Sequence, residues 1–205
     1  MTPEQQWLRL RMLEMTPAEF KAAAVKAELE EWRAVNKFCG KCGTPMTRHP
    51  KETEHAFVCP SCGYLAYPKI CPAVIVSISK GRRILLQKNS HYKVSNWTLV
   101  AGFVDPGESF EDAVRREAQE EASIELTNIR YVKSQVWPFP SNIMVGFRAE
   151  WAGGDLKADG EEVTASDWFE PEHLPELPAP GTLARFLVDE WLRDVGAEQY
   201  CAGVK

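Results

Sequence analysis

Residues 102–124 carry an acidic pattern that only a helix brings together on one face. Glu117, Glu120 and Glu121 are spaced by three and four residues, and helical neighbours at these spacings point the same way. Three like charges repel one another unless a cation lies among them, and Mg²⁺ prefers oxygen ligands such as carboxylates. The pattern is therefore typical either of a solvated acidic helix face or of a divalent-metal site.

The residues around these glutamates favour the metal site. Ser109 followed by Asp112 is similar to a capping box, so we expect the helix to run from about residue 110 to 122. The loop before it would hold Glu108 beside the carboxylates. Arg116 could bind a carboxylate or a phosphate through two parallel hydrogen bonds.

This stretch resembles the Nudix box. Eight positions match at fixed spacing over 23 residues, namely Gly102, Glu108, Arg116, Glu117, Ala118, Glu120, Glu121 and Ile124. Two positions depart from the motif: Ser123 stands where the box has glycine, and the apolar position is only Ala118. If residue 123 ends the helix in the left-handed conformation, serine costs up to about 1 kcal/mol relative to glycine. Neither departure removes an expected metal ligand.

Length and composition are those of a soluble globular protein. The chain has 205 residues, of which 44% are hydrophobic and 26% charged. It contains no apolar run near the roughly 18 to 20 residues that span a bilayer, and its N-terminus does not resemble a signal peptide. We therefore expect a cytoplasmic protein without membrane contact, whose six cysteines are thiols and metal ligands rather than disulfides.

The net charge of −5 is unevenly distributed along the chain. Residues 36–93 carry ten Lys or Arg and two Glu, whereas residues 94–125 carry two Arg and eight acidic residues. Opposite signs on adjacent segments suit a site where metal ions and cationic side chains share one anionic ligand. For the basic segment alone, a solvated surface is an equally good interpretation.

Two CxxC pairs predict a structural zinc site. Cys39 and Cys42 form the first pair, and Cys59 and Cys62 form the second pair after sixteen intervening residues. Two such pairs supply the four thiolates of a closed tetrahedral site, so we expect one Zn²⁺ per chain. A redox-active dithiol is the rival interpretation.

The remaining pattern predicts an α/β fold. We expect helices at about 3–14, 17–35 and 182–194, and strands at 70–79, 82–87, 97–101, 129–135, 143–151 and 165–169. Residues 137–140 are too rich in proline to join a ladder. The Nudix resemblance implies an α/β/α sandwich with a mixed sheet, preceded by N-terminal helices and a zinc ribbon. We expect an N-terminal helical segment, a zinc ribbon and a Nudix domain at 1–36, 37–68 and 69–197.

Segments outside the box resemble the NADH pyrophosphatase family. Residues 134–140, which read SQVWPFP, are similar to the SQPWPFP signature of that family, and the zinc ribbon and the YPKICPAVIV segment resemble it too. Further matches are Glu162-Val163, Trp168-Phe169, Leu174-Pro175 and Ala184-Arg185. The chain departs from the family at Val136, where proline is usual, at Asn142, where serine is usual, and in its shortened N-terminal region.

The resemblance implies an activity and a set of site residues. It implies hydrolysis of NADH or NAD⁺ to the nicotinamide mononucleotide plus AMP, action on NAD-capped RNA, and a homodimer. Glu117, Glu120 and Glu121 would hold Mg²⁺ or Mn²⁺, Arg116 would orient Glu117, and Glu162 would bind a second metal or act as the base, a role open also to Glu121. The expected substrate-binding residues are Phe103, Gln135, Trp137, Phe139 and Ala184.

Three further alternatives concern the substrate and the class of protein. Phe103 either stacks on a base of the substrate or belongs to the strand core. The substrate is either NADH or a compound such as ADP-ribose or another nucleoside diphosphate derivative. The third alternative is a protein of another class, namely a non-catalytic zinc-ribbon module that binds nucleotides or RNA through its basic segment.

Overall fold

The computed structural model describes residues 2–90 and 97–203 and divides into two compact units. The N-terminal unit contains the residues up to 71 together with 136–143, and the C-terminal unit contains residues 72–135 and those from 144 onward. The finer division of the chain at residues 36 and 68 stays a prediction.

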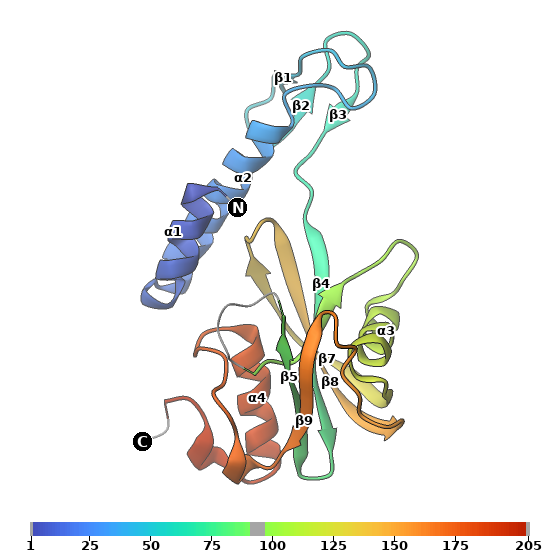
Figure 1. The fold of residues 1–205 in the computed structure, drawn as a ribbon. Coiled ribbons are helices and arrows are strands. Elements are labelled where there is room, and N and C mark those ends of the chain that lie inside the picture. Colours follow the sequence, from blue (N-terminus) through green and yellow to red (C-terminus); the bar gives the residue numbers. More distant parts are fainter. Residues whose placement is uncertain (1, 91–96, 204–205) are drawn as a thin grey trace. The chain divides into compact units, whose positions relative to one another are not determined.

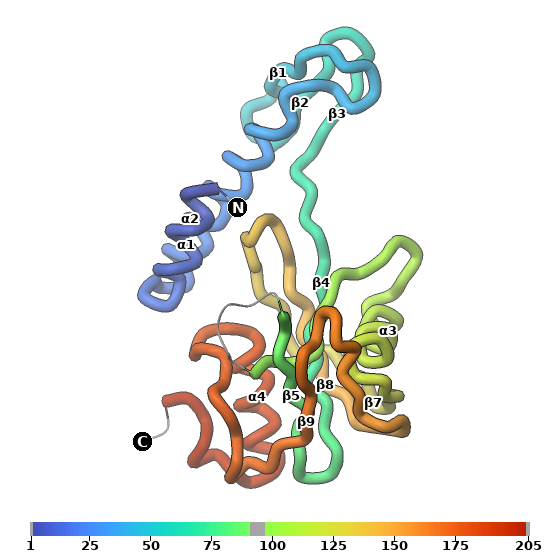
Figure 2. The backbone as a smooth tube through the Cα atoms, in the orientation of Figure 1, coloured from blue at the N-terminus to red at the C-terminus, as the bar shows by residue number. Residues whose placement is uncertain are grey.

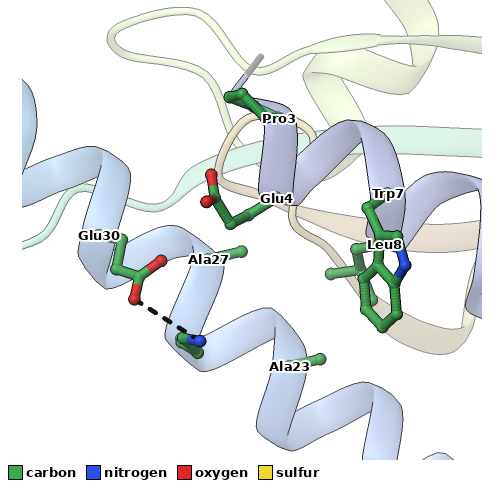
Figure 3. Close-up of a pocket in the computed structure, with 8 residues that line it drawn as sticks. Pro3, Glu4, Trp7, Leu8, Ala23, Ala27 and Glu30 are labelled. Carbon is green, nitrogen blue, oxygen red and sulfur yellow. Dashed lines mark ion pairs between the residues drawn. The ribbon is translucent and has the colours of Figure 1, made fainter.

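Two helices begin the N-terminal unit. Helix α1 (Pro3–Arg11) continues into the short 3-10 helix η1 (Met12–Glu14), and α2 (Pro17–Val35) follows. Thr2 and Thr16 cap them in capping boxes with Gln5 and Glu19, as their spacing predicts. The helices pack against each other along a groove to which α1 contributes Trp7 and Leu8 and α2 contributes Ala23 and Ala27 (Figure 3).

The core of this unit contains an aromatic residue from much later in the chain. Phe139 is 8% exposed and packs with Leu8, Ala24 and Ala27, while Trp137 lies partly buried against the same cluster. Gln5 Nε2 donates to the carbonyl of Pro140 at 2.7 Å. Residues 138–140 lie in a turn outside the ladder, as expected, and the Phe139-Pro140 peptide is cis. The expectation was wrong for Trp137, which is the last residue of strand β7 (Glu125–Trp137), because the prolines begin only at residue 138.

A small antiparallel sheet carries the cysteine pairs. Its strands are β1 (Thr47–Arg48), β2 (Phe57–Val58) and β3 (Leu65–Ala66), in that spatial order. Trp32, at the end of α2, stacks on Phe57 with ring centroids 4.7 Å apart. The stacking joins this sheet to the preceding helix.

The large sheet has six strands in the order β7-β8-β4-β5-β9, with β6 paired to β4. The strands are β4 (Cys71–Lys80), β5 (Arg83–Asn89), β6 (Val100–Phe103), β7 (Glu125–Trp137), β8 (Asn142–Gly153) and β9 (Val163–Phe169). Strands β4 and β5 form an antiparallel hairpin, in which Lys80 pairs with Arg83 across the turn.

One helix covers each face of this sheet, as Figures 1 and 2 show. Along β4, Val74 and Val76 pack with α3 (Phe110–Ala122), whereas Ile75 packs with α4 (Leu183–Asp194), because successive strand residues point to opposite faces. Short 3-10 helices η2 (Pro171–His173) and η3 (Glu198–Tyr200) flank α4. The predicted α/β/α sandwich is confirmed. In the described ranges, no helix has the length and apolar character that crossing a membrane requires.

Strand β6 differs from the predicted strand at 97–101. It begins at Val100 and continues through Gly102 and Phe103, while Thr98 makes only an isolated bridge to Gln87. The difference arises because residues 100–103 pair with the long β4, with Gly102 opposite Val74. The last two strand residues therefore lie beside α3.

Candidate active site

The predicted metal ligands gather in one cleft of the C-terminal unit. The cleft has a volume of about 430 Å³ and lies between the end of β6, one face of α3 and the loop that precedes β9. Its lining residues are Ala101, Gly102, Phe103, Asp105, Arg116, Glu117, Glu120, Glu121, Asp159, Glu161 and Glu162. The structure thus brings together all four glutamates and the arginine that the sequence singled out.

Arg116 links Glu108 to two carboxylates of the cleft. Its Nε and Nη2 donate to the two oxygens of Glu108 at 2.7 and 3.0 Å. Its Nη1 donates to Glu117 at 2.7 Å and to Glu120 at 3.0 Å, so the predicted contact with Glu117 is present. Hydrogen bonds from Arg116 hold the pKa of Glu108 below its usual value. One guanidinium therefore offsets part of the repulsion among three carboxylates.

Glu117 lies against a position that has no side chain. It is 8% exposed, and a Cβ atom on Gly102 would overlap its carboxylate. Burial raises the pKa of Glu117, and Arg116 opposes that shift. Glycine at residue 102 therefore lets α3 approach β6 closely while the carboxylate still reaches the cleft.

Glu121 differs from Glu117 in its hydrogen-bond partners. It is 4% exposed, and its Oε2 accepts a hydrogen bond from Gln87 Nε2 at 2.5 Å. Burial raises the pKa of Glu121 to about 7, with further contributions from Glu117 and Glu162, while the bonds from Gln87 and the Ala101 backbone oppose the shift. Gln87 was missed in the sequence, where its only signal is a polar residue at the end of the apolar run RRILLQ.

The loop opposite α3 presents Glu162. Asp159 orders this loop, since its carboxylate accepts from the backbone N–H groups of Glu161 and Val163 at 2.9 and 2.8 Å. Glu162 itself is exposed and lines the cleft. The loop thus provides an acidic side chain across from the helix, as the sequence suggested.

Phe103 lies at the end of β6 and lines the cleft. Its side chain is 53% exposed, so the interpretation as strand core is wrong. Its role in stacking on a base stays a prediction.

The other expected substrate-binding residues lie outside the described lining of this cleft. Gln135 connects β7 to the start of α4, since it donates to the Gly181 carbonyl at 2.9 Å and accepts from the Leu183 N–H at 2.7 Å. Ala184 is partly buried against the core beneath α4. Trp137 and Phe139 belong to the core of the N-terminal unit described above.

The structure shows the local setting of three residues that depart from the family patterns. Ser123 ends α3 in the left-handed conformation with φ 57° and ψ 35°, where serine is less favourable than glycine. Ala118 is fully buried between α3 and the sheet, where a small side chain fits. Asn142 is 6% exposed, and its amide donates to the Phe139 carbonyl at 3.4 Å across the turn.

The four cysteines of the two CxxC pairs form a second cluster, in the N-terminal unit. Their Sγ atoms all lie within 4.8 Å of one another. In the two pairs, backbone N–H groups of Lys41 and Cys62 each donate to the first sulfur at 3.4 Å. Gly43 and Gly63 follow with positive φ. Four converging sulfurs, none in a disulfide, are compatible with a tetrahedral zinc site.

Curated relatives of the chain share one activity in their names. This chain is 42% identical over 182 residues to a protein from Pseudomonas fluorescens named NAD-capped RNA hydrolase NudC. The match covers 89% of this chain and 65% of the relative. The chain is 37% identical over 192 residues to the protein of that name from Stutzerimonas stutzeri, covering 93% of this chain and 69% of the relative. The chain spans about two thirds of the length of these relatives.

Solved structures and a family model agree on the fold. A NUDIX hydrolase from Nitrosomonas europaea matches with a TM-score of 0.59 and 23% identity, covering 75% of this chain and 91% of that one. A MutT NUDIX hydrolase from Burkholderia pseudomallei matches with a TM-score of 0.50 and 24% identity, covering 59% of this chain and 97% of that one. The NUDIX domain model matches residues 69–192. The chain belongs to the Nudix family.

Proposed function

We propose that the protein hydrolyses the pyrophosphate bond of NADH and NAD⁺, releasing nicotinamide mononucleotide and AMP, and that it removes NAD caps from RNA. The observation that carries the proposal is the cleft in which Glu117, Glu120, Glu121 and Glu162 converge beside Arg116. The shared name of the curated relatives supports the choice of substrate.

The four glutamates fit a site for Mg²⁺ or Mn²⁺. All are oxygen ligands, and two of them are buried side chains held in place by hydrogen bonds. When bound, such ions neutralise charge on a pyrophosphate and lower the pKa of a bound water. Arg116 keeps Glu117 and Glu120 directed into the cleft. Its position at the cleft also provides positive charge for a phosphate oxygen.

Either Glu121 or Glu162 takes the proton from the attacking water. The two roles are separable by Glu121→Gln and Glu162→Gln variants assayed over a range of metal concentrations. Loss of a base lowers kcat even at saturating metal, whereas loss of a ligand raises the metal concentration required.

Phe103 is the best-placed aromatic residue to stack on a base of the substrate. Base stacking on an aromatic side chain contributes about 1 to 3 kcal/mol, which corresponds to roughly a 5- to 150-fold change in kcat/KM. We expect Phe103→Ala to lower kcat/KM for NADH by that factor. Phe110→Ala is the matched control, because Phe110 is also exposed but lies outside the described lining of the cleft.

A substrate panel tests the proposal as a whole. We expect NADH and NAD-capped RNA to be cleaved with a higher kcat/KM than ADP-ribose, whose far half carries no base. Equal kcat/KM values for ADP-ribose and NADH would favour an ADP-ribose hydrolase. Binding of nucleotides or RNA without any hydrolysis would favour the non-catalytic module.

The N-terminal helices support a homodimer. Trp7, Leu10 and Leu13 are 53%, 80% and 52% exposed, and a second copy of the chain would cover them. Analytical ultracentrifugation should find a dimer for the wild type and a monomer for Leu10→Glu. A Zn²⁺ ion on the four cysteines and a cytoplasmic location, where thiols stay reduced, complete the proposal.

A further inference from the structure

Gln87 is a buried polar residue that contacts the candidate site from the sheet. It is 1% exposed, and its amide reaches Glu121 on α3, 34 residues later in the chain. On β5 it shares a face with Leu85, which packs into the core beneath α3. An apolar residue would suit the packing at this position. The hydrogen bond from the amide to Glu121 is therefore the feature that requires glutamine.

Gln87 gives Glu121 an uncharged hydrogen-bond donor. Arg116 binds Glu117 and Glu120, whereas the partners of Glu121 are the Gln87 amide and the Ala101 backbone. A neutral donor directs a carboxylate without placing a positive charge where a metal ion would bind. The bond from Gln87 engages Oε2 of the carboxylate.

Ser166 occupies the facing position on the neighbouring strand. It pairs with Gln87 in the antiparallel register of β5 and β9, so the two side chains share one face. Gln87 Oε1 and Ser166 Oγ are both buried without a hydrogen-bond partner within the described residues. Leaving such groups unpaired is unfavourable, and each offers what the other lacks, directly or through a bridging water.

We propose that Gln87 is a positioning residue that fixes the Glu121 carboxylate for the metal ion, with Ser166 setting the orientation of its amide. The proposal rests on the proposed function, because it takes Glu121 as a metal ligand. Supporting residues of this kind change metal affinity by about 10- to 100-fold when they are lost.

Mn²⁺ binding to the full-length protein without substrate tests the proposal. Gln87→Met keeps the length and volume of the side chain but removes the donor, and it should weaken Mn²⁺ binding, measured by electron paramagnetic resonance, by at least about tenfold. Ser166→Ala should also weaken Mn²⁺ binding, by a smaller factor than Gln87→Met does. Leu85→Met is the control, since it alters packing on the same face of the same strand and should leave Mn²⁺ affinity unchanged.

The outcomes separate this proposal from the proposed function. If Glu121→Gln abolishes Mn²⁺ binding while Gln87→Met and Ser166→Ala bind like the wild type, the positioning role is overturned and the function stands. The positioning role is overturned as well if Leu85→Met weakens binding as much as Gln87→Met. If the wild type neither binds Mn²⁺ nor cleaves a dinucleotide, the proposed function fails, and the positioning role with it.

Discussion

The carboxylate of Glu117 occupies the space into which a side chain on residue 102 would project. Gly102 is therefore required by the close approach of β6 and α3. We expect Gly102→Ala to displace Glu117, to destabilise the fold by about 1 to 3 kcal/mol, and to lower hydrolysis strongly. Unfolding in urea and steady-state kinetics measure the two effects. Gly40→Ala is a suitable control, because a Cβ there meets no atom within 4 Å. The same free energy of unfolding and the same rate of hydrolysis in both variants would contradict this role of Gly102.

The cysteine cluster predicts about one equivalent of tightly held zinc per chain. Elemental analysis of dialysed protein should find it, and Cys39→Ser or Cys59→Ser should lower the zinc content and destabilise the N-terminal unit, because structural zinc binding contributes to folding. A wild-type protein without zinc and with four titratable thiols at these positions would exclude the site.

Ser123 offers a stabilising substitution. Because it lies in the left-handed region, we expect Ser123→Gly to raise the free energy of unfolding by up to about 1 kcal/mol. Ser123→Ala should bring no such gain, since alanine has the same steric conflict. Thermal unfolding of the three proteins checks the prediction, which an unchanged Tm in Ser123→Gly would refute.

Without divalent metal, stability should fall as the pH rises. The pKa of Glu121 is raised from 4.5 to about 7 by burial, so the folded chain holds its proton more tightly than the unfolded chain does. This stabilisation is complete below the unfolded pKa and is lost as the pH rises through about 7, a change on the order of 3 kcal/mol.

Urea unfolding at a series of pH values in metal-free buffer measures this dependence. Glu121→Gln should flatten it between about pH 5 and pH 8, because glutamine does not titrate there. The same slope in both proteins would show that another group is responsible.

Local rules account for much of what the sequence predicted correctly. The starts of α1, α2 and α3 depend on contacts within three residues, so Thr2, Thr16 and Ser109 identify them. The glutamates of α3 share a cleft because helical spacing alone brings them together.

Contacts between distant parts of the chain could not be predicted in this way. Nothing near Gln87 indicates that its amide meets Glu121, because strand order and register decide that contact. Phe139 likewise becomes core only through helices more than a hundred residues earlier in the chain. The start of β6 depends on its pairing with β4, which no local signal at residues 97–99 reveals.

The most direct test of the proposed hydrolysis is product analysis on NADH in ¹⁸O-labelled water with Mn²⁺ or Mg²⁺. We expect reduced nicotinamide mononucleotide and AMP, with the label in one of the two phosphates, and loss of more than about tenfold in rate for both Glu120→Gln and Glu121→Gln in folded protein. Release of free nicotinamide, no cleavage, or more than about a tenth of the wild-type rate in both variants would contradict the proposed hydrolysis.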